Sequence, residues 1–226
     1  MKKKRRKSYV PALVLAALAG LAVFFGFRWL ADNKLPNVSE PVEVYVRPSS
    51  SAADVLGQIS GSVRRPGSLE RMFRAKKVGE YMQPGHYSFG AGTSSVYIAR
   101  ALNNCWQTPV KLTLSGSLRL RGEIARKISS QMMLDSAEVA AALSDAALLK
   151  EFGVTPATVF AAFMPDTYEI YWTASMREIL ARNKAACDAF WTPDNLAKAK
   201  VQGLTRAQAV TLASIVKGES RVQGDF

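Results

Sequence analysis

The longest apolar run of the chain lies near its beginning, where residues 8–27 carry no charged side chain. Twenty residues at the α-helical rise of about 1.5 Å are long enough to cross the hydrocarbon core of a bilayer. Only a helix satisfies its own backbone groups in lipid, so we predict a transmembrane helix over 8–30. A cleaved signal peptide is the alternative, but its apolar core usually has about 7–15 residues, and this run continues well past the cleavage-like triplet 17–19.

Beyond a polar stretch at 31–41, which we expect to be a short stalk, one pattern occurs three times. A short alternating or β-branched run is followed by a hydroxyl residue and then by an amphipathic helical segment. The predicted strands are 42–46, 85–89 and 110–114, and the helices that follow them are 52–59, 94–102 and 118–132, with a further helix at 68–77. These elements predict a small α/β module over 42–134. It resembles the LysM-like sugar-binding unit, although many α/β modules share this pattern.

From Asp135 onward the periodicity becomes mostly helical. Ser, Asp, Thr or Pro begins each helical segment, as is usual at helix N-termini. The predicted helices are 135–143, 145–152, 156–163, 175–190, 193–201 and a last helix from Thr205, whose Gln208 completes a capping box. Pro165 ends the third helix, and the aromatic run 164–172 is expected to be extended. The chain is therefore predicted to be α+β.

The charge of the chain is concentrated at its N-terminus. The net charge is +12, and the six basic residues 2–7 supply half of it. By the positive-inside rule they form a cytoplasmic tail over 1–7, so everything after Ala31 lies outside the cytoplasm. Arg28 and Trp29 suit the far interface. We therefore predict a single-pass protein of the cytoplasmic (inner) membrane. The remaining positive charge suits an anionic partner, or is a solubility bias; the anchor excludes nucleic acid.

Metal and thiol chemistry have few candidate residues. The chain contains two cysteines, Cys105 and Cys187, and one histidine, His86, which do not make a zinc set, so we predict no metal and no cofactor. We expect two unpaired, partly buried thiols in helical segments, and a single disulfide is the alternative. His86 is expected to be a surface or partly buried turn residue and not a catalyst.

One carboxylate lies on an apolar helix face. Leu212, Ile215, Val216 and Glu219 follow the i, i+3, i+4, i+7 spacing of one face. A buried lone carboxylate is unfavourable when ionised, so burial would raise the pKa of Glu219 and keep it protonated, as a glycosidic general acid requires. The alternative is that Glu219 faces water beyond the packed part of the helix, because Gly218 makes the helix end uncertain.

Two segments carry a resemblance to a known family. Residues 211–220 (TLASIVKGES) and 163–169 (FMPDTYE) resemble the catalytic-glutamate segment and the Phe-Pro-Asp-Thr-Tyr motif of the membrane-bound endolytic murein transglycosylases, the MltG/YceG-like family. Residues 85–87 and 107–110 are similar to the same family. Lys217, Gly218 and the pair 161–162 depart from its usual pattern. The family's catalytic domain continues beyond residue 226, so the resemblance implies that 135–226 is part of a catalytic domain in a truncated chain.

The resemblance also implies a mechanism. Glu219 would protonate the glycosidic oxygen between N-acetylmuramic acid and N-acetylglucosamine, then accept the proton of the muramyl 6-hydroxyl as this attacks its own anomeric carbon. The product is a 1,6-anhydro end. Asp166, Thr167 and Tyr168 would bind the substrate or support Glu219; the alternative is a turn with a packed tyrosine. Of Tyr168, Tyr171 and Trp172, we expect at least two to pack in the core.

The partners that the resemblance implies are nascent peptidoglycan glycan strands, the membrane and cell-wall synthesis proteins. A second function remains open from the same residues. The chain would then be a non-catalytic, membrane-anchored protein that binds peptidoglycan or acts as a scaffold, using its positive charge and its LysM-like module.

Overall fold

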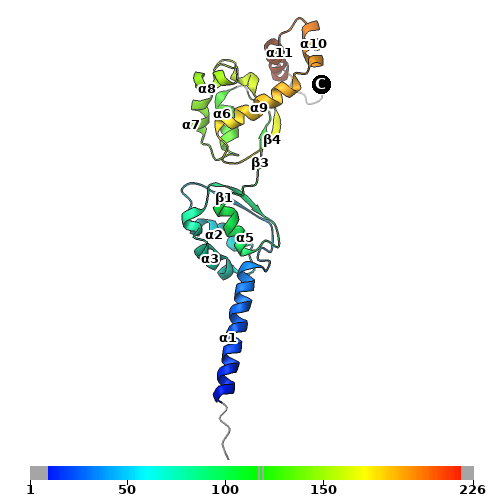
Figure 1. The fold of residues 1–226 in the computed structure, drawn as a ribbon. Coiled ribbons are helices and arrows are strands. Elements are labelled where there is room, and N and C mark those ends of the chain that lie inside the picture. The colour runs from blue at the N-terminus through cyan, green and yellow to red at the C-terminus, as the bar shows by residue number, and fades with distance from the viewer. Residues whose placement is uncertain (1–9, 117, 119, 220–226) are drawn as a thin grey trace, which may run out of the picture. The chain divides into compact units, whose positions relative to one another are not determined.

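The computed structural model describes residues 10–116, 118 and 120–219, without the side chains of residues 11, 161 and 217–219. Over these residues the chain is α+β, as predicted, with helices and two small two-stranded sheets (Figure 1). It divides into two compact units, Met1–Thr108 and Pro109–Phe226.

The first unit begins with the long apolar helix α1 (Val10–Asn33). Its segment Ala12–Asn33 has a mean hydropathy of 2.0 and is long and apolar enough to cross a membrane. Its large apolar side chains, such as Phe24 and Phe25, are exposed along the helix. The predicted apolar helix is therefore present, and it extends three residues beyond the predicted end at residue 30 because Ala31 and Asp32 pack against the rest of this unit.

The strands of the first unit pair as a two-stranded antiparallel sheet. β1 (Val42–Val46) runs antiparallel to β2 (Gly85–Phe89), and Val44 lies opposite Tyr87. Alternation along β1 buries every second residue, as expected for a strand that covers a core on one face. The helices that close this core are α2 (Ala52–Ser60), α3 (Pro66–Ala75), the short α4 (Val78–Tyr81) and α5 (Ser95–Asn103).

The ends of these helices follow the sequence signals closely. Ser51 caps α2 through a capping box with Asp54, in which the Ser51 Oγ accepts from the Asp54 N–H at 3.2 Å. α3 begins at Pro66, two residues before the predicted start, because proline is well suited to the first position of a helix. His86 is buried in β2 and does not lie in a turn, which corrects that prediction.

The second unit is built around the sheet of β3 (Val110–Leu114) and β4 (Asp166–Ile170), in which Leu112 lies opposite Tyr168. Its helices are α6 (Arg121–Ser129), α7 (Ser136–Ala142), α8 (Ala146–Glu151), α9 (Met176–Phe190), α10 (Pro193–Val201) and α11 (Arg206–Glu219). Because β3 pairs with β4, the predicted module 42–134 contributes elements to both units.

Two predicted helices of this unit differ from the structure. The prediction of a helix at 156–163 is wrong: a turn leads into the 3₁₀ helix η1 (Val159–Ala162). Thr155 and Thr158 exchange side chain–backbone hydrogen bonds of 2.9 and 3.3 Å, the pattern of a helix N-terminus, but the turn that they close is followed by 3₁₀ and not α-helical pairing. The helix predicted at 118–132 is shorter, since α6 begins at Arg121 and leaves Leu120 exposed.

Candidate functional site

The two segments that resemble a family motif lie in the same unit. The 3₁₀ helix η1 packs against α11. Phe163 is the C-terminal cap of η1, and β4 begins three residues later at Asp166. The motif at 163–169 therefore continues directly from the element that touches the helix of the second motif.

A local capping box and contacts with α9 and its C-terminal cap hold the beginning of α11 in place. Thr205 and Gln208 form the predicted capping box, in which the Thr205 N–H donates to Gln208 Oε1 at 2.9 Å. Arg206 donates to Asp188 of α9 at 2.9 Å, and its guanidinium lies 5.7 Å from the centre of the Trp191 ring. Lys184 and Arg206 lower the pKa of Asp188, so this carboxylate remains charged well into the acidic range.

Glu219 is the last residue of α11, and its side chain lies outside the described residues, as does that of Lys217. Its predicted burial and protonation thus stay predictions. The rest of its apolar face is described: Leu212, Ile215 and Val216 are 48%, 56% and 47% exposed. The part of this face that the structure describes lies at the surface and does not pack into the core.

The sheet of β3 and β4 has one buried and one exposed face. Tyr168 lies on the buried face with Leu112, and its hydroxyl donates to the Met164 carbonyl at 2.9 Å. Burial, together with the nearby Asp166 carboxylate, raises the pKa of Tyr168 to about 12. Tyr168 is therefore a neutral core residue that holds the strand in place.

Asp166 and Thr167 are exposed at the beginning of β4. The Thr167 N–H donates to the Asp166 carboxylate at 2.7 Å, a local bond that fixes this carboxylate beside the strand. The Thr167 hydroxyl lies 3.1 Å from that of Thr113 on the neighbouring strand. These two predicted site residues are thus both exposed, and Thr167 lies on the face of the sheet that also carries Thr113, whereas Tyr168 points into the core.

The sequence did not reveal which residues lie beside Thr167 on the exposed, polar face of the sheet. Thr113 lies opposite Thr167, and Lys111 lies opposite Glu169. The Gln131 side chain accepts from the Thr113 N–H at 2.9 Å and donates to the Thr113 carbonyl at 3.0 Å. These bonds satisfy the backbone groups of Thr113 at the edge of β3. The alternation of β3 predicts that Lys111 and Thr113 share a face, but only the strand pairing sets them beside β4. The face carries hydroxyl, amide and charged groups of the kind that bind polyhydroxylated ligands.

Of the three aromatic residues at and after β4, two pack in the core, as predicted. Tyr168 and Trp172 are buried, and Tyr171 is exposed.

The two cysteines lie in different units, and neither forms a disulfide. Cys187 is buried with a pKa raised by that burial, whereas Cys105 is exposed in a left-handed turn at φ 55°. The prediction that Cys105 is partly buried in a helix is therefore wrong.

Comparison with known proteins bears on both motif segments. The model of the YceG-like family matches residues 44–226. A crystal structure of a yceG-like protein from Listeria monocytogenes is similar, with a TM-score of 0.48 and 18% identity over 82% of this chain and 66% of that one. The chain thus spans slightly less than two thirds of that protein's length. No curated protein matches the chain at a significant level.

Proposed function

Because the chain belongs to the YceG-like family, we propose that it is a membrane-anchored endolytic lytic transglycosylase that cleaves nascent peptidoglycan strands. The bond cleaved is that between N-acetylmuramic acid and N-acetylglucosamine, and the product ends in 1,6-anhydro-N-acetylmuramic acid. The observation that carries this proposal is the match of the family model to residues 44–226, which include both motif segments; the packing of η1, which directly precedes the motif at 163–169, against α11 is consistent with it.

The proposed chemistry needs one protein acid. Glu219 donates a proton to the glycosidic oxygen as the bond to the anomeric carbon breaks. It then accepts the proton of the muramyl 6-hydroxyl, which attacks the same carbon and closes the anhydro ring. The nucleophile belongs to the substrate, so proximity replaces the second carboxylate that ordinary glycosidases use. The cycle returns Glu219 to its protonated form and consumes no water.

The residues near the beginning of β4 take different roles in this proposal. Asp166 and Thr167 are exposed and offer a carboxylate and a hydroxyl to the sugar. Tyr168 is buried with its hydroxyl bound to Met164, so it acts by positioning the strand. The exposed pair Thr113 and Thr167 extends the polar surface that would bind the glycan.

The membrane topology belongs to the same proposal. The helix α1 spans the cytoplasmic membrane, and the basic residues 2–7 keep the N-terminus inside. Both units then face the peptidoglycan. The α/β part of the first unit acts as a LysM-like module that holds glycan, and the residues from 135 onward belong to the catalytic domain. Cell-wall synthesis proteins are the expected protein partners.

The test uses Glu219→Gln in the full chain, reconstituted in lipid and incubated with peptidoglycan strands. Mass spectrometry of the products measures the release of anhydro-ended muropeptides. We expect the substitution to lower this release by at least about 100-fold, since it removes general acid catalysis. Glu80→Gln, at an exposed carboxylate paired with Lys77 in the first unit, is the matched control and should leave the release unchanged.

Retained activity in Glu219→Gln, with unchanged circular dichroism, would contradict the assigned mechanism. The alternative is a non-catalytic, membrane-anchored protein that binds peptidoglycan. The departures at Lys217 and Gly218 and the exposed apolar face of α11 favour this alternative. It predicts that the unaltered chain sediments with peptidoglycan and releases no anhydro ends.

A further inference from the structure

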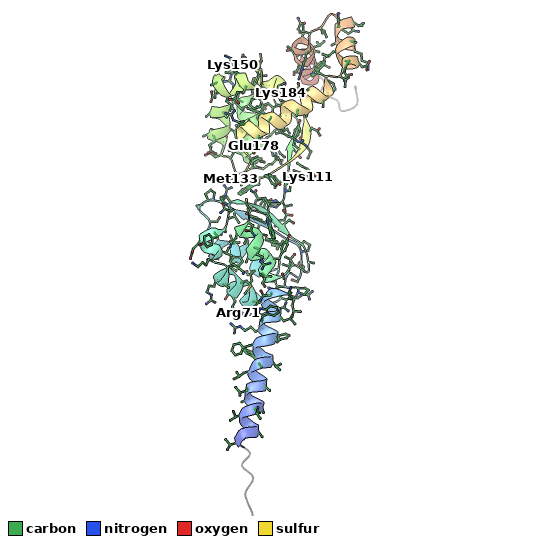
Figure 2. All side chains as sticks on the ribbon, viewed as in Figure 1. Arg71, Lys111, Met133, Lys150, Glu178 and Lys184 are labelled. Atoms are coloured by element: carbon green, nitrogen blue, oxygen red, sulfur yellow. The ribbon has the colours of Figure 1, made fainter. Side chains whose placement is uncertain are left out.

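The end of α1 is fixed to the α/β part of the first unit by polar contacts. Arg71 of α3 donates to both carboxylate oxygens of Asp32, from Nε at 2.9 Å and from Nη2 at 2.6 Å. The Ser68 hydroxyl donates to the Ala31 carbonyl at 3.3 Å. Figure 2 shows Arg71 beside this end of the helix. The residues that follow the apolar run are therefore part of the packed unit.

The segment that follows α1 is also fixed to this unit by hydrogen bonds. Asn37 is fully buried, and its side chain donates to the Arg65 carbonyl at 3.1 Å and to the Ser95 hydroxyl at 2.9 Å. Its Oδ1 accepts from the Arg65 N–H at 2.8 Å. These bonds tie the segment after α1 to both α3 and α5, so the distance between α1 and α3 is fixed by packing.

With α1 inserted in the membrane as proposed, the fixed distance between α1 and α3 sets the depth of α3 relative to the bilayer. The charge-free run ends at Phe27, and Arg28 begins the interface. Asp32 is four residues further, or about 6 Å along the helix axis. The head-group layer on each side of a bilayer is about 5–8 Å thick. Arg71, which is bonded to Asp32, therefore lies at the level of the lipid head groups.

The surface at this level is basic. Arg28 and Lys34 are exposed on either side of Asp32, and Arg64 and Arg74 are exposed before and within α3. Arg74 lies one helical turn beyond Arg71. The exposed acidic residue of α3 is Glu70, so positive charge is in excess. Guanidinium groups bind phosphate with two parallel hydrogen bonds, which makes arginine well suited to lipid phosphates.

We propose that Arg28, Lys34, Arg64 and Arg74, at the junction of α1 and α3, form a binding surface for the head groups of anionic phospholipids. The observation that identifies the partner is the continuity of this basic surface with the apolar helix. Phosphates of the bilayer into which α1 inserts are the anions nearest to it. The bound lipids hold the first unit against the membrane and so fix the height at which the rest of the chain begins.

The experiment uses the full chain in nanodiscs that contain equal amounts of phosphatidylglycerol and phosphatidylcholine. Native mass spectrometry after release from the disc measures the ratio of the two lipids retained by the protein. We expect a clear excess of phosphatidylglycerol, and a loss of about fivefold in that ratio for each of Arg28→Gln and Arg74→Gln. Lys150→Gln, at an exposed lysine of α8 in the second unit, is the matched control and should retain the wild-type ratio.

Equal retention of the two lipids by the unaltered chain would overturn the inference, as would an unchanged ratio in both arginine variants. A surface for free anions is a further contrary outcome, and it would appear as displacement of phosphatidylglycerol by millimolar inorganic phosphate. Flotation of the same protein with vesicles separates this inference from the proposed anchoring. A chain that floats without lipid preference contradicts the inference alone, and a chain that does not float contradicts the anchoring itself.

Discussion

Arg71 and Asp32 are joined by two charge-assisted hydrogen bonds across 39 residues of sequence, and they connect α3 to the end of α1. The Asp32 side chain is only 7% exposed and that of Arg71 31%. Removal of one partner leaves the other charge poorly solvated, so we expect Arg71→Ala to lower the free energy of unfolding by about 1–3 kcal/mol. Urea unfolding of the full chain in detergent micelles, followed by circular dichroism, measures this difference.

Lys77 provides the control for this prediction. It pairs with Glu80, and both side chains are 60% exposed, so solvent screens their attraction. Lys77→Ala should change the free energy of unfolding by less than about 0.5 kcal/mol. If the Arg71 and Lys77 variants were equally stable, the contact between α1 and α3 would not depend on the buried ion pair.

Tyr168 gives a prediction for alkaline pH. Its pKa is about 12 in the folded chain and near 10 when unfolded, so between these values the folded state keeps a proton that the unfolded state has lost. Stability therefore falls as the pH rises from 10 to 12, by up to about 2–3 kcal/mol from this group. Tyr168→Phe should remove this loss, although at pH 7 it should destabilise the second unit by about 1 kcal/mol, since the bond to Met164 disappears.

The measurement is urea unfolding at pH 7 and at intervals up to pH 12, followed by tryptophan fluorescence. Tyr171→Phe is the control, because Tyr171 is exposed one residue beyond the same strand and should alter neither the stability at pH 7 nor its alkaline decline. The pKa of Tyr87 in the first unit is also raised by burial, so an alkaline loss from that unit should persist in both variants. An identical decline in wild type and Tyr168→Phe would contradict the assignment.

Local sequence signals account for most of the secondary structure. The alternation of Val42, Val44 and Val46 identifies β1 because a strand places every second side chain on one face. The pair Thr205 and Gln208 locates the start of α11, since each side chain satisfies a backbone group that a helix leaves unpaired. These signals depend on residues within one turn or one strand and do not require knowledge of the fold.

Features that depend on distant residues were not predictable. Nothing near Val110 indicates that β3 pairs with β4 more than fifty residues later, and this pairing is what assigns the strand to the second unit. The ion pair of Asp32 and Arg71 is equally non-local. The periodicity of α11 predicts that Leu212 and Ile215 share a face, but it does not say what covers that face, and the structure leaves both exposed.

The candidate site was located by resemblance and refined by geometry. The helical spacing of apolar residues alone identified Glu219 as a carboxylate on an apolar face, and the resemblance to the two motifs added Asp166, Thr167 and Tyr168. The strand alternation of β4 then separates these residues, since Thr167 and Tyr168 must face opposite sides of the sheet. The motif at 163–169 therefore contains both exposed residues and a core residue.

The two thiols should differ in reactivity. Cys187 is 4% exposed and its pKa is raised by burial, so it has little thiolate and no access to reagents, whereas Cys105 is exposed. We expect the folded chain to gain one N-ethylmaleimide adduct at neutral pH and the urea-unfolded chain to gain two, as counted by mass spectrometry. Cys105→Ser should show no rapid adduct when folded. Equal labelling rates at the two cysteines would mean that the environment of Cys187 opens readily.

The cap of α9 bears on the site because this helix carries Asp188, which binds Arg206 at the start of α11. The Ser175 Oγ accepts from the Glu178 N–H at 3.3 Å and donates to the Glu178 carboxylate at 2.7 Å. Ser175→Ala removes both bonds, so we expect the free energy of unfolding to fall by about 1 kcal/mol at pH 7. Ser144→Ala is the matched control, because the Ser144 hydroxyl only adds to a helix carbonyl at 3.1 Å and should contribute less than about 0.5 kcal/mol.

Acid should reduce the difference between the wild type and Ser175→Ala. The bonds from Ser175 lower the pKa of Glu178 below its ordinary value, so the folded state binds a proton less readily than the unfolded state. The stability that these bonds contribute is therefore complete above the unfolded pKa and is lost as the pH falls through the folded one. Urea unfolding at pH 7 and pH 3 should show a smaller effect of the substitution at pH 3. If the effect of Ser175→Ala were as large at pH 3 as at pH 7, the ionised carboxylate of Glu178 would not be what closes the cap.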